Sequence, residues 1–191
     1  MNSFYSRDEL VAIGFKFVGF NVMISRKASI YGADNISIGN NVRVDDFCIL
    51  SGKIIIKNNV HIAAYSALYG SDVGIIIEDF ANISSRVCVY AVSDDYSGNT
   101  MTNPTIPEKY KNLEKRITVI GKHAIVGTGS TVLPGASLAE GTAVGAMSLI
   151  KKSTEAWKIY AGIPAQIIAD RSRGLLSLEK EYLENEGSKN Y

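Results

Sequence analysis

The sequence from residue 38 to residue 68 reads IGNNVRVDDFCILSGKIIIKNNVHIAAYSAL, and an aliphatic residue recurs in it at every sixth position. Those positions are 38, 44, 50, 56, 62 and 68. A second run keeps the interval from Ile120 to Ile150, and shorter runs lie at 24–36 and 77–89. A period of six fits neither the 3.6 residues of an α-helical turn nor the alternation of a simple hairpin. A β-sandwich would have to produce six consecutive matches twice by chance, so we predict a repeat fold.

Each group of six residues is expected to supply one short strand and one corner of a solenoid. The aliphatic residue points to the axis, and small or polar residues turn the chain. Three such sides close one coil, so the runs predict about six coils, which at the usual strand spacing stand about 29 Å tall. The composition agrees, because the 23 Ile and 14 Val outnumber the 11 Leu, and β-branched side chains favour strands.

Composition and charge narrow the class of protein. The 191 residues are 46% hydrophobic, which suits one domain with a core. The net charge of +1 gives no field to hold a polyanion, so no nucleic-acid partner is expected. The first ten residues lack the apolar run of a secretory signal, and the weakly charged stretch 124–150 is too rich in Gly, Ser and Thr for a membrane span. Cys48 and Cys88 lack metal-ligand spacing and fit free thiols in a reducing compartment, so a cytoplasmic location is predicted.

The two ends of the chain resemble caps for the repeats. Ser6 and Glu9 have the spacing of a capping box, and Gly14 follows the apolar residues, so a short helix is predicted between them. Leucines among alternating charges at 172–184 predict an amphipathic helix that packs on the prism or on a neighbour. The predicted organisation is a helical cap at 1–20, a repeat domain at 21–168 with a loop at 92–116, and a C-terminal helix at 169–191.

Several motifs, in order, carry a family resemblance over about residues 20–170. They are IGNNV at 38–42, VGTGS at 126–130 followed by LPG at 133–135, VGA at 144–146 and AGIPA at 161–165. The sequence resembles the hexapeptide-repeat acyltransferases, in the branch that holds galactoside and maltose O-acetyltransferases and the acyltransferases of nucleotide-linked amino sugars. Its N-terminal half and the loop SDDYSG are most similar to enzymes of O-antigen and capsule gene clusters.

The resemblance implies a fold, an assembly and a place for the active site. The fold class is all-β, a left-handed parallel β-helix with a short N-terminal helix and a C-terminal helix. The implied assembly is a homotrimer with active sites in the clefts between subunits. The left hand is contrary to the usual right-handed rule for parallel strands, so it follows from the resemblance and not from the period.

The six-residue pattern breaks between Val89 and Ile120, and a loop of this length in a compact domain is usually functional. In the galactoside and maltose enzymes a catalytic His lies at the start of this loop, where the present chain has Asp94 and Asp95. Transfer to a hydroxyl group calls for a base such as His, whereas a neutral amine is already nucleophilic and a carboxylate can take its proton. We therefore predict an amine acceptor, with Asp94 as the leading catalytic residue and Asp95 as the second. The alternative is that both carboxylates cap a turn.

The two histidines of the chain are further candidates. His61 lies in an apolar run and is predicted either to face the cleft, as a substrate ligand or base, or to be structural. His123 follows a corner glycine and is expected on the surface. No metal is expected, since the zinc sites known on this type of prism need three imidazoles.

The acyl donor that the resemblance implies is acetyl-coenzyme A or another short acyl-coenzyme A lying along the later coils. Small residues let its pantetheine arm approach backbone amides. Two lysines are placed to neutralise its phosphates, and the 161–165 segment is expected to lie beside the adenine. The cofactor-binding candidates are Gly127, Thr128, Ala146, Ser148, Lys151, Lys152, Gly162 and Pro164. The alternatives are tight corners for the small residues and a solvated surface for the lysines.

Acceptor-binding residues are predicted by location in the earlier coils. They are Asp45, Asp46, Tyr65, Tyr69, Ser84 and Arg86. The predicted function is transfer of an acyl group to the amino group of a nucleotide-linked deoxy sugar, with dTDP as the nucleotide, in surface-polysaccharide synthesis and without a covalent acyl-enzyme. One alternative is a saccharide O-acetyltransferase with His61 as base, and another is a non-catalytic β-solenoid scaffold.

Overall fold

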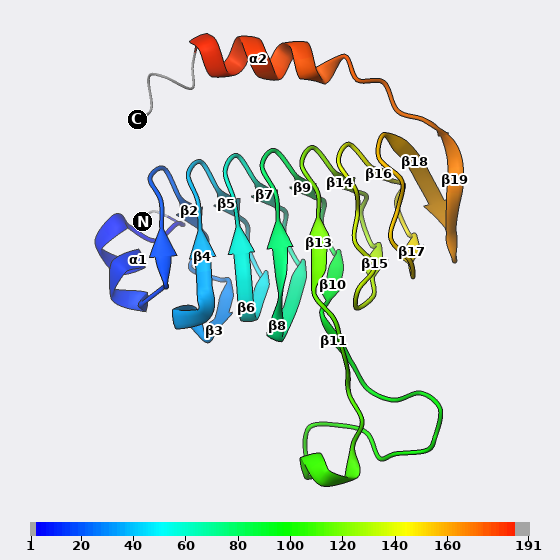
Figure 1. Ribbon diagram of the computed structural model, residues 1–191. Coiled ribbons are helices and arrows are strands. Elements are labelled where there is room, and N and C mark those ends of the chain that lie inside the picture. Colours follow the sequence, from blue (N-terminus) through cyan, green and yellow to red (C-terminus); the bar gives the residue numbers. More distant parts are fainter. Residues whose placement is uncertain (1–2, 186–191) are drawn as a thin grey trace.

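The computed structural model describes residues 3–185 and is a parallel β-helix (Figure 1). In Figure 1 the strands β4, β6 and β8 run upward on the near side, and the chain then passes over the top to the far side while it advances from left to right. This combination of turn and advance makes the helix left-handed. The predicted fold class is therefore confirmed, including the hand that the resemblance implied.

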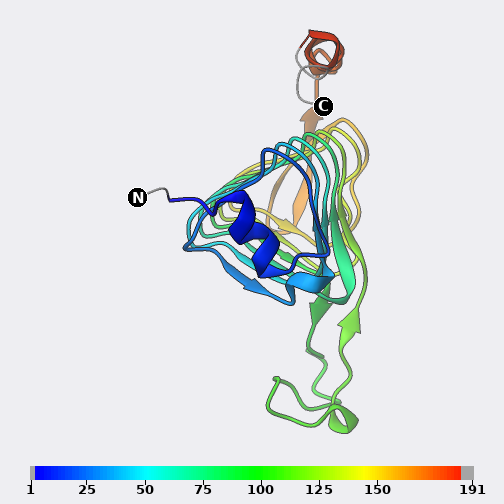
Figure 2. The ribbon, with the colours of Figure 1, turned by 90° about the vertical axis from the view of Figure 1, so that its left-hand side faces the viewer.

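The prism has three faces, each built from short parallel strands (Figure 2). Face 1 holds β1 (Phe17–Val18), β4 (Ile36–Ile38), β13 (Thr118–Ile120) and the later halves of β6 (Ile49–Ile56) and β8 (Ala67–Ile77). Face 2 holds β2 (Met23–Ile24), β5 (Arg43–Val44), β7 (His61–Ile62), β9 (Asn82–Ile83), β14 (Ile125–Val126), β16 (Ala143–Val144) and β18 (Lys158–Gly162). Face 3 holds β3 (Ser29–Tyr31), β10 (Cys88–Tyr90), β15 (Thr131–Val132), β17 (Leu149–Ile150) and the first halves of β6 and β8.

The strands of face 2 number the coils from 1 to 7 in the order β2, β5, β7, β9, β14, β16 and β18. The sequence predicted about six coils. The difference arises at β18, where Tyr160 pairs with Val144 and takes the axial place of an aliphatic residue. Antiparallel β19 (Ala165–Asp170) then pairs with β18 and ends the stack.

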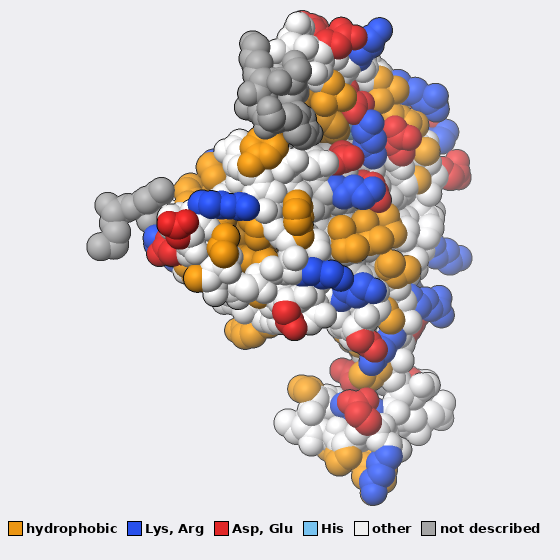
Figure 3. Space-filling model, turned by 60° about the vertical axis from the view of Figure 1, so that its left-hand side comes forward, with side chains coloured by type: hydrophobic (Ala, Val, Ile, Leu, Met, Phe, Trp, Pro, Cys, Tyr) orange, Lys and Arg blue, Asp and Glu red, His pale blue; other side chains and the backbone are white. Residues whose placement is uncertain are grey.

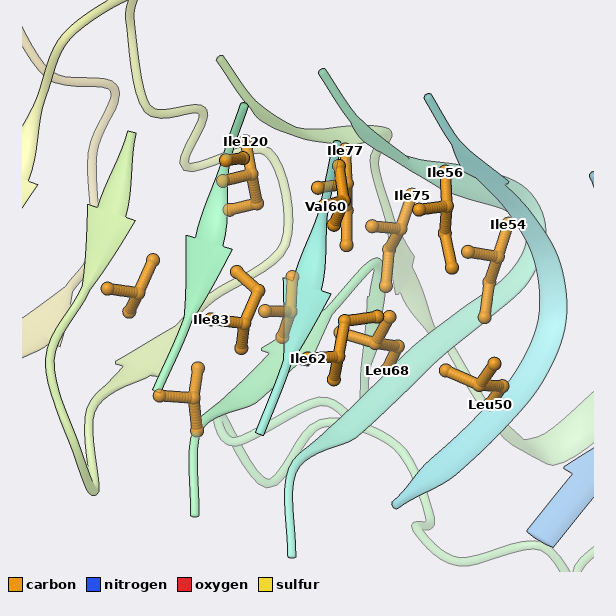
Figure 4. Packing of buried hydrophobic residues seen from close by; sticks show 14 of the residues in the cluster. Leu50, Ile54, Ile56, Val60, Ile62, Leu68, Ile75, Ile77, Ile83 and Ile120 are labelled. Carbon is orange, nitrogen blue, oxygen red and sulfur yellow. The ribbon is translucent and has the colours of Figure 1, made fainter. Parts of the chain in front are cut away.

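The residues of the six-residue pattern form the core along the axis. Leu50, Ile62 and Leu68 have no exposed surface, and Ile56 is 1% exposed. Figure 4 shows these side chains pointing inward from successive coils. Ile30 is the one member of the pattern that is only partly buried. The predicted role of the aliphatic residues is confirmed.

At corner A, and at corner B of coils 2–6, the third residue after an axial position adopts a left-handed backbone. Corner A, between faces 1 and 2, has positive φ at Asn21, Asn41, Asn59, Phe80, His123, Gly141 and Trp157. Corner B, between faces 2 and 3, has positive φ at Phe47, Tyr65, Arg86, Gly129 and Met147. Gly141 is required at its place because a Cβ there would lie 2.4 Å from the Trp157 ring.

Helix α1 (Arg7–Ile13) covers the N-terminal end as predicted. Ser6 and Glu9 form the reciprocal capping box, and Gly14 ends the helix in a left-handed conformation. Arg7 donates hydrogen bonds to the carbonyl groups of Gly19 and Val18, which ties the helix to the first coil. Residues 1–2 of the predicted cap lie outside the described residues.

Helix α2 (Leu175–Asn185) lies along corner A (Figures 1 and 2). Glu179 pairs with Lys122 at 2.6 Å and with His123 at 2.9 Å, and the Tyr182 hydroxyl donates to Asn59 at 3.1 Å. The predicted surface position of His123 is wrong, because α2 covers this residue and leaves it 6% exposed. The predicted C-terminal helix exists but begins at Leu175, and the predicted region 186–191 lies outside the described residues. No helix within residues 3–185 is long and apolar enough to cross a bilayer.

The predicted loop leaves the prism at corner C, between faces 3 and 1, and forms an arm (residues 92–116). Its root is a two-stranded ribbon of β11 (Val92–Ser93) and β12 (Glu114–Lys115). The Lys115 ammonium lies 3.1 Å from Asp72 on the preceding coil, which fixes the root against the prism. Beyond the root the arm projects away from the body, and basic, acidic and hydrophobic side chains lie along it in Figure 3. Tyr96 on the arm is 93% exposed.

Candidate active site

Most of the predicted binding residues come together along corner B, although they are up to about a hundred positions apart in the sequence. The connections from face 2 to face 3 place them there, one group to a coil. Coils 2–4 contribute Asp45, Asp46, Tyr65, Ser84 and Arg86, and coils 5 and 6 contribute Gly127, Thr128, Ala146 and Ser148. Corner B therefore has an acceptor half and a donor half that meet between coils 4 and 5, where the arm interrupts the pattern.

The backbone amides of the donor half divide into two kinds. The Gly127 amide donates to Val144 at 2.8 Å, and the Ser148 amide donates to the Ser130 hydroxyl at 3.1 Å. The amides of Thr128 and Ala146 have no hydrogen-bond partner within residues 3–185, and both residues are exposed. Thr128 and Ala146 thus present the amides that can bind the carbonyl groups of an extended ligand.

Gly127 and Ser148 have a clear structural purpose in the same corner. A Cβ at Gly127 would lie 2.5 Å from the Ala146 amide nitrogen of the next coil, so only glycine fits there. The Ser148 hydroxyl accepts a hydrogen bond from Gly162 at 3.1 Å, which joins coil 6 to the turn between β18 and β19. These two residues shape the corner that holds the free amides.

A hollow of about 410 Å³ lies at the C-terminal end of the prism. Lys151, Lys152, Tyr160 and Pro164 are among the residues that line it. Both lysines are exposed, so their ammonium groups are available to an anionic ligand. The hollow therefore combines an aromatic ring, a proline and two cations, which suits a nucleotide that carries phosphates.

Both carboxylates of the acceptor half are already paired within the chain. Asp45 contacts Arg43 at 2.7 Å and His61 at 2.8 Å. Burial alone raises the pKa of Asp45, but the hydrogen bonds from His61 and Arg43 outweigh it and hold the pKa below its usual value. Hydrogen bonds from Ser25 and Lys27 likewise lower the pKa of Asp46. Asp45 and Asp46 thus remain anionic at neutral pH and brace coils 1–3 against one another.

His61 lies on face 2, in register with Arg43 and Asn82 of the neighbouring coils. Its Nε2 is 2.8 Å from Asp45, and its Nδ1 is 3.1 Å from the side-chain oxygen of Asn82. With both ring nitrogens occupied, His61 would have to give up one partner before it could take a proton from a substrate. This geometry favours the structural alternative for His61.

The two tyrosines predicted to bind the acceptor take part in ring stacks; Tyr65 lies on corner B, and Tyr69 lies in β8 on face 3. Tyr65 stacks on Phe47 with the ring centroids 5.0 Å apart, and Tyr69 stacks on Tyr90 at 5.1 Å. Burial, with the nearby Cys88 as a smaller cause, raises the pKa of Tyr90 to about 12, so this phenol stays neutral. Sequence reasoning missed Phe47. The corner rule would have found it, because Phe47 is the third residue after axial Val44, as Tyr65 is after Ile62.

The two carboxylates of the arm differ in their surroundings. Asp95 accepts hydrogen bonds from the Ser97 amide and the Thr100 hydroxyl, both at 2.8 Å. Hydrogen bonding from the Ser97 side chain, then from the Ser97 amide and Thr100, lowers the pKa of Asp95. Asp94 accepts one bond, from the Asn103 amide at 3.2 Å, through a single oxygen. Asp95 therefore fits the turn-capping alternative, while Asp94 keeps an oxygen for a substrate.

A single chain does not bring Asp94 to the rest of the site. The arm leaves from corner C, and in Figure 2 it points away from the other corners of the prism. Within residues 3–185 the printed hydrogen bonds of the Asp94 side chain stay inside the arm. The donor half of corner B, the acceptor half and the arm thus define three parts of an acyltransferase of the hexapeptide-repeat class.

Known proteins with related sequences and structures agree with this class. The chain is 51% identical over 177 residues to a dTDP-4-amino-4,6-dideoxy-D-glucose acyltransferase from Escherichia coli, which covers 91% of this chain and 92% of the relative. It is 30% identical over 163 residues to WbbJ of Escherichia coli strain K12, which bears the name of a lipopolysaccharide biosynthesis O-acetyl transferase, covering 80% and 78% of the two chains. No family model matches the chain.

The crystal structure of AntD, an N-acyltransferase from Bacillus cereus in complex with dTDP and 3-hydroxybutyryl-CoA, matches with a TM-score of 0.95 and 55% identity over 100% of both chains. Other solved forms of AntD are substituted at position 84 or 94, namely S84A, S84C, S84T, D94N and D94A. The chain belongs to the hexapeptide-repeat family of dTDP-amino-sugar acyltransferases. The family resemblance inferred from the motifs is confirmed.

Proposed function

We propose that the protein transfers a short acyl group from coenzyme A to the 4-amino group of dTDP-4-amino-4,6-dideoxyglucose, for use in a surface polysaccharide. The observation that carries this proposal is the pair of free amides, Thr128 and Ala146, on the same corner as the acceptor half. The relatives named above support the choice of nucleotide and sugar. Position 84 of this chain is a serine and position 94 an aspartate, the residue types that were substituted in AntD.

The chemistry proceeds by direct attack. The acyl-coenzyme A extends along the donor half, where Thr128 and Ala146 bind carbonyl groups of the pantetheine arm and the two lysines of the hollow face its phosphates. Asp94 orients the ammonium group of the sugar and accepts its proton. The amine nitrogen then bonds to the thioester carbon, the C–S bond breaks, and the second proton lost by the nitrogen on amide formation passes to the departing sulfur.

The proposed assembly is a cytoplasmic homotrimer whose sites are shared between subunits. An arm that carries Asp94 and an exposed tyrosine, and that points away from corner B of its own chain, is suited to complete the site of a neighbour. Closed rings of such head-to-tail contacts give each subunit one complete site.

A thiol-release assay tests the proposed reaction. Purified protein, acetyl-coenzyme A and dTDP-4-amino-4,6-dideoxyglucose should release free coenzyme A, and the matched sugar with a 4-hydroxyl group should release far less. Faster release with the hydroxyl sugar would favour an O-acetyltransferase. No release with a panel of nucleotide sugars and acyl-coenzyme A thioesters would favour a non-catalytic scaffold.

Mixing two inactive variants tests the shared site. Thr128→Trp fills the donor half of corner B, and Asp94→Asn disables the arm. When the two chains are unfolded together and refolded, random assembly gives roughly a quarter of the wild-type activity if arm and corner come from different subunits. Each variant refolded alone is the control, and activity no higher than theirs would contradict a site completed by a neighbour.

Substitution of either lysine of the hollow should weaken binding of the acyl donor and leave binding of the acceptor unchanged. Lys151→Gln and Lys152→Gln are each expected to raise the KM for acetyl-coenzyme A by about 5-fold, the effect of losing one exposed ion pair of about 1 kcal/mol. The KM for the nucleotide sugar should stay unchanged. Lys16→Gln, on the first coil, is a charge-matched control. Equal KM values for acetyl-coenzyme A in all four proteins would show that the two lysines do not bind its phosphates.

A further inference from the structure

The root of the arm is too short to hold the arm by itself. Its ribbon has two residue pairs, Val92 with Lys115 and Ser93 with Glu114. A two-stranded ribbon is marginally stable in water even when it is longer than this. Asp94 follows the ribbon directly, so the direction in which the ribbon leaves the prism decides where the Asp94 carboxylate lies. Contacts between the root and the prism are therefore needed to hold that direction.

Coil 3 carries an extra segment beside the root. Its axial positions 68 and 77 pair with positions 50 and 56 of coil 2, so the connection at corner C is three residues longer in coil 3. The register between β6 and β8 shifts over this stretch. Asp72 belongs to the extra segment, and its carboxylate lies 3.1 Å from the Lys115 ammonium of the arm. The departure from the six-residue period thus supplies a prism carboxylate that contacts the root.

The ion pair of Asp72 and Lys115 is exposed and is formed by two charged groups. A hydrogen bond from the Ser71 hydroxyl at 2.9 Å, and then the bond from Lys115, lower the pKa of Asp72. The Asp72 and Lys115 side chains are 68% and 36% exposed, so the pair contributes little to the stability of the prism. Its influence falls on the short ribbon, whose nearby orientations differ little in free energy.

The following coil supports the root from the other side. Arg116 lies beside Gly135 at corner C of coil 5, where a Cβ on Gly135 would lie 2.8 Å from the Arg116 Cδ atom. The buried Thr118 hydroxyl donates to the Tyr90 carbonyl at 2.8 Å and accepts from the Gly135 amide at 3.1 Å. The missing side chain of Gly135 leaves room for the stem of Arg116, so the root rests between coils 3 and 5.

We propose that Asp72 and Lys115 are positioning residues for Asp94, because their ion pair sets the direction in which the arm root carries the Asp94 carboxylate to the acceptor amine. This assignment rests on the proposed function and adds a prism residue that acts through the arm. Neither residue of the pair has to touch a substrate. Loss of the pair therefore lowers kcat and leaves binding of the acyl donor on corner B unchanged.

Charge reversal in the full-length protein tests the pair. Asp72→Lys and Lys115→Asp should each lower kcat by at least about 5-fold, the loss expected from one exposed ion pair, with the KM for acetyl-coenzyme A unchanged. The double variant restores opposite charges and should return kcat to within about twofold of the wild type. In the Asp94→Asn background, Asp72→Lys should cause no further loss, because the pair acts through Asp94. Glu78→Lys breaks an ion pair with Lys57 at corner A and is the matched control that should keep the wild-type kcat.

Hydrogen exchange of peptides that span β11 and β12, measured by mass spectrometry, gives a readout that does not depend on the reaction. Exchange should be faster in Asp72→Lys and unchanged in Glu78→Lys. Unchanged exchange in Asp72→Lys would overturn the proposal even if the wild type acylates the sugar. Faster exchange with unchanged kcat, or a double variant as slow as the single ones, would overturn it as well. Faster exchange in Asp72→Lys together with no acyl transfer by the wild type would support the contact as the support of the arm and reject the reaction.

Discussion

Replacement of Asp94 by asparagine is expected to lower kcat by at least about 100-fold, the lower end of what a positioned proton acceptor contributes. Asparagine has nearly the same shape and can still accept the hydrogen bond from the Asn103 amide, so the arm keeps its conformation. It cannot take a proton from the ammonium group of the sugar. Steady-state kinetics with both substrates varied should show the loss in kcat, with the KM for acetyl-coenzyme A unchanged.

Two other arm variants show whether the loss of activity is specific to the Asp94 carboxylate. Asp95→Asn should cost less than Asp94→Asn, because both oxygens of Asp95 serve the turn formed with Ser97 and Thr100. Glu108→Gln removes a carboxylate that is paired with Lys111 on the same arm, and it should leave kcat at the wild-type value. If Asp94→Asn retains full activity while His61→Ala abolishes it, the reaction uses His61, and O-transfer becomes the better account.

Replacement of Ile56 by alanine is expected to lower the free energy of unfolding by about 2–5 kcal/mol. Ile56 lies on the axis, is 1% exposed, and sits between Ile38 and Ile77 of the adjacent coils. These β-branched neighbours have restricted χ1 rotamers and cannot easily fill the space of the lost side chain, so a cavity remains. Urea unfolding followed by circular dichroism measures the change.

A matched substitution outside the axis shows whether the position or the residue type matters. Ile168→Ala removes the same atoms from β19, where the side chain is 64% exposed, and should cost less than about 1 kcal/mol. Equal losses for Ile56→Ala and Ile168→Ala would mean that the axial aliphatic residues do not form the stabilising core of the prism.

The interior of this fold can be read from the sequence because it depends on one side chain per six residues. Ile38, Val44 and their successors are buried as the period requires, and the local hydrogen bonds of Ser6 and Glu9 fix the first helix. The seventh coil was missed because Tyr160 replaces an aliphatic residue in the pattern. The hand of the coil came from the resemblance, since a period contains no information on chirality.

The site was harder to predict because its properties depend on contacts between distant segments. Motif positions placed the donor residues on one corner, but only the hydrogen bonds between coils separate the free amide of Thr128 from the occupied amide of Gly127. The burial of His123 depends on Glu179, which follows it by 56 positions. Phe47 carries no motif; its corner position follows from the six-residue period, but its contact with Tyr65 of the next coil is set by the fold.

Helix α2 affects how the molecule unfolds. In a solenoid each coil contacts its two neighbours, so the terminal coils are free to fray one at a time. The C-terminal segment breaks that independence, because Tyr182 contacts coil 3 at Asn59 while Glu179 contacts coil 5 at His123. Coils 3–5 are thereby joined through a segment that follows coil 7. Local opening at the C-terminal end therefore has to release the contacts of α2 with coils 3 and 5, which couples that end of the prism to its middle.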